Sequence, residues 1–354
     1  MRAVLAIFLM LAATANLRAD TFVYVSMAPE QKIQSYRLDA SNGSLTTVET
    51  LAVDGAPGCL AIDPAKKFLF ASLRSTSTLA SFAIDPTTGK LKLLSTAALP
   101  AGENAAFVGT DRTGRWLISA SYAAGKVVVH RIAKDGKLES PAVQTVATAK
   151  TAHSFASDPT GKLVFVPHVT PNAVYQFRFD PATGKLTEAG QAAGGADKAG
   201  PRHIALHPHL PLAFTSNEVG SSITSYRIDA ESGLKAAQTL STLPGDFKEP
   251  NTTAEVKVHP SGNFVWVSNR GHDSLAGFAI NEADQLSLIE QMPTEKTPRS
   301  FEISPDGQYL FAAGEGSGKL AVYRCDKRTG KLTRIHTLDV GKSLTWVRAV
   351  ELGK

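Results

Sequence analysis

The chain has 354 residues, of which 43% are hydrophobic and 19% are charged, so it can bury a large core and is not intrinsically disordered. Its 2 cysteines exclude a disulfide-rich scaffold and a four-cysteine zinc or iron–sulfur site. The formal net charge of +5 comes from lysines and arginines that are scattered along the chain, which argues against a nucleic-acid partner.

The first element in chain order is predicted to be an export signal. Arg2 is followed by a small and apolar run over residues 3–13, shorter than the roughly 20 residues that span a bilayer. A basic start, a short apolar core and then small residues are typical of a secretory signal peptide. We prefer cleavage after Ala19, with Ala15 as the alternative, which leaves 20–354 as a single domain. The protein is then exported, periplasmic or secreted, with no membrane segment after cleavage.

The rest of the chain repeats. A turn with Asp or Asn and usually Gly precedes a leucine seven times, at spacings of 46 to 52 residues, at Leu45, Leu91, Leu138, Leu186, Leu234, Leu286 and Leu332. A second turn occurs once in each of six units, at Asp63-Pro64, Asp111-Arg112, Asp158-Pro159, His207-Pro208, His259-Pro260 and Ser304-Pro305. Seven repeats of this length predict one closed or stacked architecture rather than several domains.

Each repeat contains four short β-type runs separated by turns, the pattern of one propeller blade. Residues 21–51 lack an opening strand, whereas the segment 344–350 is an unpaired strand at the other end of the chain. Placed together, these segments complete one blade. The prediction is therefore an all-β, seven-bladed β-propeller in which one blade is closed by strands from both chain ends, which removes exposed sheet edges.

Alignment of the repeats on the second turn brings charged residues to one end of the first hairpin of each blade. The position six residues before the second residue of the turn holds Gly58, Ala106, His153, Arg202, Ala254 and Arg299. The position ten residues after it holds Arg74, Tyr122, Val169, Glu218, Arg270 and Glu315. If the first strands line the central channel, both positions face one mouth of it. Arginines there suit a small anionic molecule, and Glu or His suits proton transfer.

A purely structural role is the alternative for several of these residues. Charges at strand ends, such as Arg74 and Glu315, are commonly solvated or paired with a neighbour. Arg202 and Glu218 belong to one blade, where a structural salt bridge is the simpler interpretation.

The remaining histidines and the cysteines are interpreted as structural. His207 and His259 occupy the second turn, at the opposite end of the hairpin, where they replace Asp. We therefore expect no metal site and no cofactor. Cys59 and Cys325 fall in non-adjacent repeats, so we predict two buried thiols.

Four segments resemble the seven-bladed lactonase family: AGPRHIALHP (199–208), SNEVGSSI (216–223), TAEVKVHPSGNFVWVSNR (253–270) and TPRSFEISPDGQYLFAAG (297–314). The resemblance extends over about residues 22–350. It implies a site made of His153, Arg202, Glu218 and Arg270, all of which lie at the two aligned positions. The other polar members, Arg74, Tyr122, Arg299 and Glu315, are expected to bind substrate.

The resemblance also implies a reaction. The family includes the bacterial propeller-type 6-phosphogluconolactonase, which hydrolyses 6-phospho-D-glucono-1,5-lactone, and the fungal carboxy-cis,cis-muconate cyclase. We expect hydrolysis of a small anionic sugar lactone, with the substrate left open because the phosphogluconolactonase is cytoplasmic and this chain is predicted to be exported. A non-catalytic propeller that binds a ligand or protein, and a lyase or cycloisomerase like the muconate cyclase, are the alternatives. The oligomeric state is not predicted.

Overall fold

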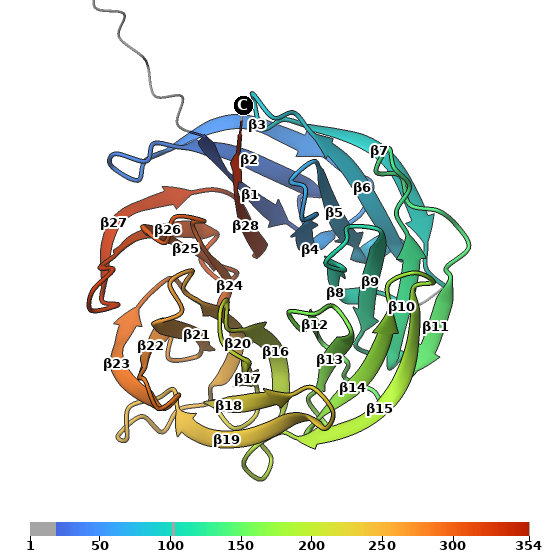
Figure 1. The fold of residues 1–354 in the computed structure, drawn as a ribbon. Coiled ribbons are helices and arrows are strands. Elements are labelled where there is room, and N and C mark those ends of the chain that lie inside the picture. Colours follow the sequence, from blue (N-terminus) through green and yellow to red (C-terminus); the bar gives the residue numbers. More distant parts are fainter. Residues whose placement is uncertain (1–18, 101–102, 354) are drawn as a thin grey trace, which may run out of the picture.

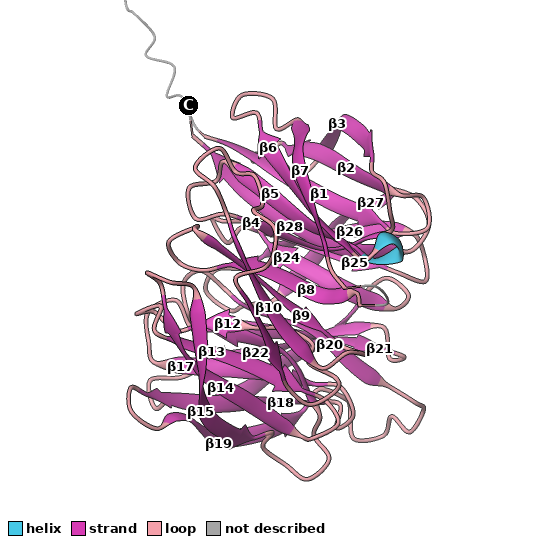
Figure 2. Ribbon diagram, turned by 90° about the vertical axis from the view of Figure 1, so that its right-hand side faces the viewer, coloured by secondary structure: helices cyan, strands magenta, loops and turns pink. Residues whose placement is uncertain are grey.

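The computed structural model describes residues 19–100 and 103–353, and within these ranges it contains seven four-stranded antiparallel sheets arranged in a ring (Figure 1). This confirms the predicted all-β, seven-bladed propeller. The predicted signal peptide lies almost wholly outside the described residues. Among the residues described, the helical content is one short 3₁₀ helix, η1 (Arg74–Thr76), and no helix is long and apolar enough to cross a membrane. Figure 2 shows the same sheets from the side, with strands forming most of the molecule.

The blades follow one another in chain order, and each starts at the central channel. From the channel outward, blade one contains β28 (Leu344–Leu352), β1 (Asp20–Met27), β2 (Lys32–Leu38) and β3 (Leu45–Ala52). Blade two contains β4 (Pro57–Ile62), β5 (Phe68–Leu73), β6 (Thr78–Ile84) and β7 (Leu91–Ala98). Blade three contains β8 (Ala105–Thr110), β9 (Trp116–Ser121), β10 (Lys126–Arg131) and β11 (Gln144–Ala147). Blade four contains β12 (Ala156–Ser157), β13 (Leu163–His168), β14 (Ala173–Asp180) and β15 (Lys185–Ala193).

The last three blades have the same plan. Blade five contains β16 (Pro201–Leu206), β17 (Leu212–Asn217), β18 (Ser222–Asp229) and β19 (Gly233–Ser241). Blade six contains β20 (Thr252–Val258), β21 (Phe264–Arg270), β22 (Ser274–Ile280) and β23 (Leu286–Pro293). Blade seven contains β24 (Pro298–Ile303), β25 (Tyr309–Gly314), β26 (Lys319–Cys325) and β27 (Leu332–Asp339).

The two chain ends close blade one together, as predicted. β28 pairs antiparallel with β1 over its whole length, from Asp20 opposite Leu352 to Met27 opposite Leu344. In Figure 1 the last strand lies on the channel side of the first. The closing strand also touches the next blade, because the Thr345 hydroxyl donates to the Pro57 carbonyl at 2.9 Å.

The second turn of each repeat is held by its first residue. In blade two, Asp63 Oδ1 accepts hydrogen bonds from the backbone N–H groups of Lys67 and Phe68 at 2.7 and 2.6 Å. In blade five, His207 Nδ1 accepts from the backbone N–H groups of His209 and Leu210 at 3.1 and 2.9 Å. The imidazole thus accepts backbone hydrogen bonds in the turn as the carboxylate does, which confirms that the turn histidines replace Asp.

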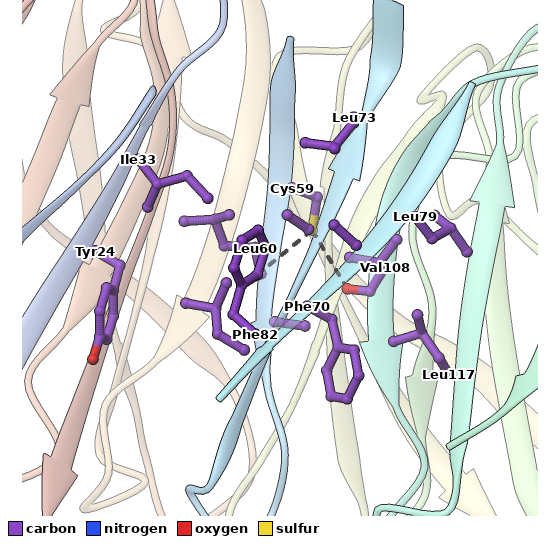
Figure 3. Packing of buried hydrophobic residues seen from close by; sticks show 14 of the residues in the cluster. Tyr24, Ile33, Cys59, Leu60, Phe70, Leu73, Leu79, Phe82, Val108 and Leu117 are labelled. Carbon is purple, nitrogen blue, oxygen red and sulfur yellow. Dashed lines mark hydrogen bonds between the residues drawn. The ribbon is translucent and has the colours of Figure 1, made fainter. Parts of the chain in front are cut away.

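The hydrophobic core lies between adjacent sheets, where middle strands are buried on both faces. Figure 3 shows part of it, where Cys59 on β4 packs against blade three with its Sγ 3.4 Å from the Val108 carbonyl oxygen. Cys59 and Cys325 are free and buried, at 1% and 5% exposure, as predicted. Burial raises the pKa of each thiol to about 12. Neither thiol is therefore ionised near neutral pH, and neither has the properties of a nucleophile.

Candidate active site at one mouth of the channel

The structure places the predicted residues at one end of the inner hairpins, as the repeat alignment required. Arg202 lies in β16 and Glu218 directly follows β17, both in blade five. Arg270 ends β21 in the neighbouring blade six. His153 precedes β12 in blade four, and Tyr122 follows β9 in blade three. These side chains come from four consecutive blades, so the site lies to one side of the channel axis.

Glu218 lies between two arginines from adjacent blades. Its Oε1 is 2.7 Å from Arg270 Nη2, and its Oε2 is 3.6 Å from Arg202 Nε. Arg270 Nη2 also donates to the Thr253 carbonyl at 2.9 Å. The Arg202 side chain is 1% exposed, whereas that of Glu218 is 20% exposed and so reaches solvent. The expected pairing of Arg202 with Glu218 exists, but the two arginines share this carboxylate, and Arg270 is the closer of the two.

His153 and Tyr122 form an aromatic wall beside these charges. Their ring centroids are 5.5 Å apart in an edge-to-face arrangement. Burial, followed by the charge of Arg202, lowers the pKa of His153 well below its usual value, so the imidazole is neutral. Burial and then the Glu218 carboxylate raise the pKa of Tyr122. Within the described part of the chain, His153 Nδ1 has no hydrogen-bond partner.

A second charged group comes from blades seven and two. Arg299 Nη1 is 3.3 Å from Glu315 Oε2, an ion pair within one blade. Arg74 is close enough to this pair that, after burial, the charge of Arg299 lowers its pKa while Glu315 raises it. Gly58 provides space for this side chain, since a Cβ there would lie 2.8 Å from Arg74 Cδ. The ion pair agrees with a structural role for Glu315, and the group again has two arginines for one carboxylate.

Two buried residues at this site were not predicted, His203 and Glu255. His203 Nε2 is 3.1 Å from Arg202 Nη1, and His203 Nδ1 is 2.9 Å from Glu255 Oε1. Strict alternation along a strand would place Arg202 and His203 on opposite faces. A β-bulge between Pro201 and His203 shifts the register there, so that consecutive residues approach each other in the channel. The one sequence signal was the G-P-R-H segment, in which His203 follows Arg202 directly.

The described ranges, 19–100 and 103–353, contain no group of three His, Cys, Asp or Glu residues arranged to hold a metal ion. The groups at the mouth are cations, carboxylates, a neutral imidazole and a phenol. Such a set can bind an anion, stabilise a developing negative charge and transfer a proton.

Comparison with known proteins gives consistent results. The sequence profile of the family described as "Lactonase, 7-bladed beta-propeller" matches residues 18–349. The chain is 34% identical to the 6-phosphogluconolactonase of Pectobacterium carotovorum over 337 residues, covering 93% of this chain and 98% of that one. It is 33% identical to the 6-phosphogluconolactonase of Yersinia enterocolitica, with 92% and 97% covered. Among solved structures, the periplasmic gluconolactonase PpgL of Pseudomonas aeruginosa superposes with a TM-score of 0.87 at 25% identity, covering 94% of this chain and 100% of that one.

Proposed function

Because the chain belongs to the family of seven-bladed β-propeller lactonases, we propose that it hydrolyses a sugar lactone to the open-chain acid. The observation that carries the proposal is the Glu218 carboxylate held between Arg202 and Arg270 at the mouth of the channel. The relatives named above are lactone-hydrolysing enzymes by name, and this cluster provides the charges that ester hydrolysis needs.

The reaction is the attack of water on an ester. The oxygen of water adds to the lactone carbonyl carbon, and negative charge develops on the carbonyl oxygen. Arg202 and Arg270 are suited to stabilise that charge, because their guanidinium groups are held in place before the substrate arrives. Collapse of the intermediate breaks the bond between the carbonyl carbon and the ring oxygen, and that oxygen takes up a proton.

Two groups at the mouth are able to move that proton, Glu218 and His153. Either one takes a proton from the attacking water and returns it to the ring oxygen. Glu218 is the more accessible, while His153 is neutral and its Nδ1 has no hydrogen-bond partner among the described residues. Sugar δ-lactones open slowly in water without help, so one such group with two arginines is sufficient.

We assign the second charged group to substrate binding. Arg74 and Arg299 share one carboxylate, that of Glu315, which leaves one positive charge unbalanced in this group. An anionic lactone would neutralise this excess, with Arg74 or Arg299 on its charged group and Tyr122 beside its ring. This favours a phosphorylated or carboxylated lactone over a neutral one.

We further propose that the protein acts outside the cytoplasm. The support is the signal-peptide pattern at its start and its likeness to a periplasmic gluconolactonase. Mass spectrometry of the protein purified from a periplasmic extract would give its first residue, expected to be Asp20 or Asn16. Recovery only from the cytoplasm with residues 1–19 attached would contradict export.

The function is tested by hydrolysis of 6-phosphogluconolactone and glucono-δ-lactone above the uncatalysed rate. We expect Glu218→Gln and Arg202→Ala each to lower kcat/KM by about 10²- to 10³-fold, because each removes a charge that acts on the transition state. Glu188→Gln and Arg178→Ala are matched controls on exposed positions of blade four and should keep wild-type rates. A folded wild-type protein that hydrolyses neither lactone would refute the proposal.

A further inference from the structure

Three side chains form a hydrogen-bond network that extends from the site along the channel. It starts at Arg202, passes through His203 and ends at Glu255 on the neighbouring inner strand β20, through hydrogen bonds of 3.1 and 2.9 Å. Arg202 and His203 are each 1% exposed, and Glu255 is 3% exposed. Glu255 Oε1 also accepts from the Val256 N–H at 3.2 Å. None of the sequence motifs assigns a role to His203 or Glu255.

The donors and acceptors in this hydrogen-bond network allow only one protonation state of His203. A guanidinium group has donors only, so Arg202 Nη1 donates and His203 Nε2 accepts. The ring proton of His203 is therefore on Nδ1, from which it is donated to the Glu255 carboxylate. A doubly protonated ring would place an N–H against the Arg202 N–H. Burial and then the charge of Arg202 lower the pKa of His203 well below its usual value, in agreement with a neutral ring.

The His203 ring is also fixed by packing. Its centroid lies 5.0 Å from that of His153, 5.5 Å from that of Trp346 and 5.7 Å from that of Phe107. These rings come from three other blades, so the imidazole cannot turn without moving them. A fixed ring fixes the direction of the hydrogen bond that it accepts from Arg202.

Arg202 requires such support because of its surroundings. It is fully buried, and the charges of Arg270 and Arg299 add to burial in lowering its pKa. Glu218 alone cannot balance it, since that carboxylate is closer to Arg270. Burial of a cation without adequate partners is strongly unfavourable. Glu255, reached through His203, is the second carboxylate on the other side of the guanidinium group.

We propose that His203 and Glu255 are positioning residues of the lactonase site, which hold the Arg202 guanidinium charged and in a single orientation beside Glu218. They do so through Arg202 and do not touch the substrate. This inference rests on the proposed function, because the orientation of Arg202 matters to the rate only if Arg202 acts on the lactone.

The kinetic test compares two carboxylates of the same channel. Glu255→Gln removes the negative charge at the end of the hydrogen-bond network. We expect kcat/KM to fall by about 10- to 100-fold, as for other residues that orient a catalytic group. Glu302→Gln is the control, because Glu302 pairs with Lys257 at 3.4 Å and Arg348 at 2.5 Å and not with Arg202. It should keep the wild-type rate. If wild type is active and both variants match it, or both fall alike, the positioning role is refuted.

A second pair of variants separates the hydrogen bond from packing. His203→Phe keeps an aromatic ring among its neighbours but accepts nothing from Arg202, whereas His203→Gln keeps an oxygen that can accept. The glutamine variant should retain several times more activity than the phenylalanine variant, at similar stability to urea. The reverse order would show that packing alone matters.

The protonation state is tested without any enzymatic activity. In the wild-type protein with ¹⁵N-labelled histidine, NMR at pH 7 should show His203, identified by its absence in His203→Gln, as a neutral ring protonated on Nδ1. A ring protonated on Nε2, or a charged ring, would overturn the proposal. If wild type hydrolyses neither lactone, the proposed function fails, and this spectrum still decides whether His203 and Glu255 hold Arg202 as described.

Discussion

Burial sets the protonation of the histidine beside the two arginines. His153 is 5% exposed, and burial together with the Arg202 charge lowers its pKa well below 6.5. A base must be unprotonated to act, so its contribution is lost only as the pH falls through its own pKa. With that pKa lowered, His153 remains neutral from about pH 6.5 to 8.

The expected result is a kcat/KM that does not fall between pH 8 and 6.5 once uncatalysed hydrolysis is subtracted. The measurement is a pH–rate profile for wild type and His153→Asn. A loss of activity centred near pH 6.5 in wild type, absent from the variant, would show that His153 titrates at its usual value, contrary to its buried position.

The inner strands explain which part of the site could be predicted. Turn residues recur because each tight turn needs an Asp-like acceptor or a Gly, so the repeat alignment found Arg202 and Glu218 at one mouth. The bulges were not visible, because an extra residue in a strand leaves no fixed sequence pattern. They recur in β4, β8, β16, β20 and β24. As a result, Glu255, which lies within the bulge of β20, and His203, which directly follows that of β16, were missed.

The second turns also join neighbouring blades. His259 Nδ1 accepts from the Ser261 N–H, so His259 Nε2 carries the proton and donates to the Gly307 carbonyl of the next blade at 2.9 Å. Gly307 has a φ of +70°, and a Cβ at this position would collide with the His259 ring. The turn of blade seven and the imidazole of blade six therefore depend on each other.

Gly307→Ala should lower the free energy of unfolding by more than about 1 kcal/mol, because alanine is strained at this φ and displaces the His259 ring. Gly245→Ala is the control, since a Cβ there has no atom within 4 Å and its φ is outside the left-handed region. Urea unfolding of both variants gives the difference. Equal stability of the two variants would show that the turn tolerates the change.

Seven blades were predictable because one four-stranded sheet cannot bury both faces alone, so the pattern must repeat until the ring closes. The ion pairs between side chains of different blades could not be predicted from the sequence. Whether Glu218 contacts Arg202, Arg270 or both depends on how the bulged strand ends approach each other around the channel. The distance from Glu218 Oε1 to Arg270 Nη2 is shorter than any that joins it to its own blade's arginine.

Closure of the ring by β28 should make unfolding of the propeller cooperative. Deletion of residues 344–354 removes β28, exposes the edge of β1 and breaks the contacts of Thr345 with Ser26 and Pro57. We expect aggregation and loss of a single sharp unfolding transition, because an open edge pairs with other chains. Size-exclusion chromatography and urea unfolding test this, with deletion of 353–354 as the control. A monomer that unfolds with the wild-type midpoint would contradict it.

The pairing of β1 with β28 also determines when blade one can finish folding during synthesis. Ser26 and Thr345, whose hydroxyls are 2.9 Å apart, are separated by 319 positions in the chain. During synthesis the first strand is made early, but its partner on the channel side is the last to be made. Blade one therefore stays incomplete until almost the whole polypeptide has been released.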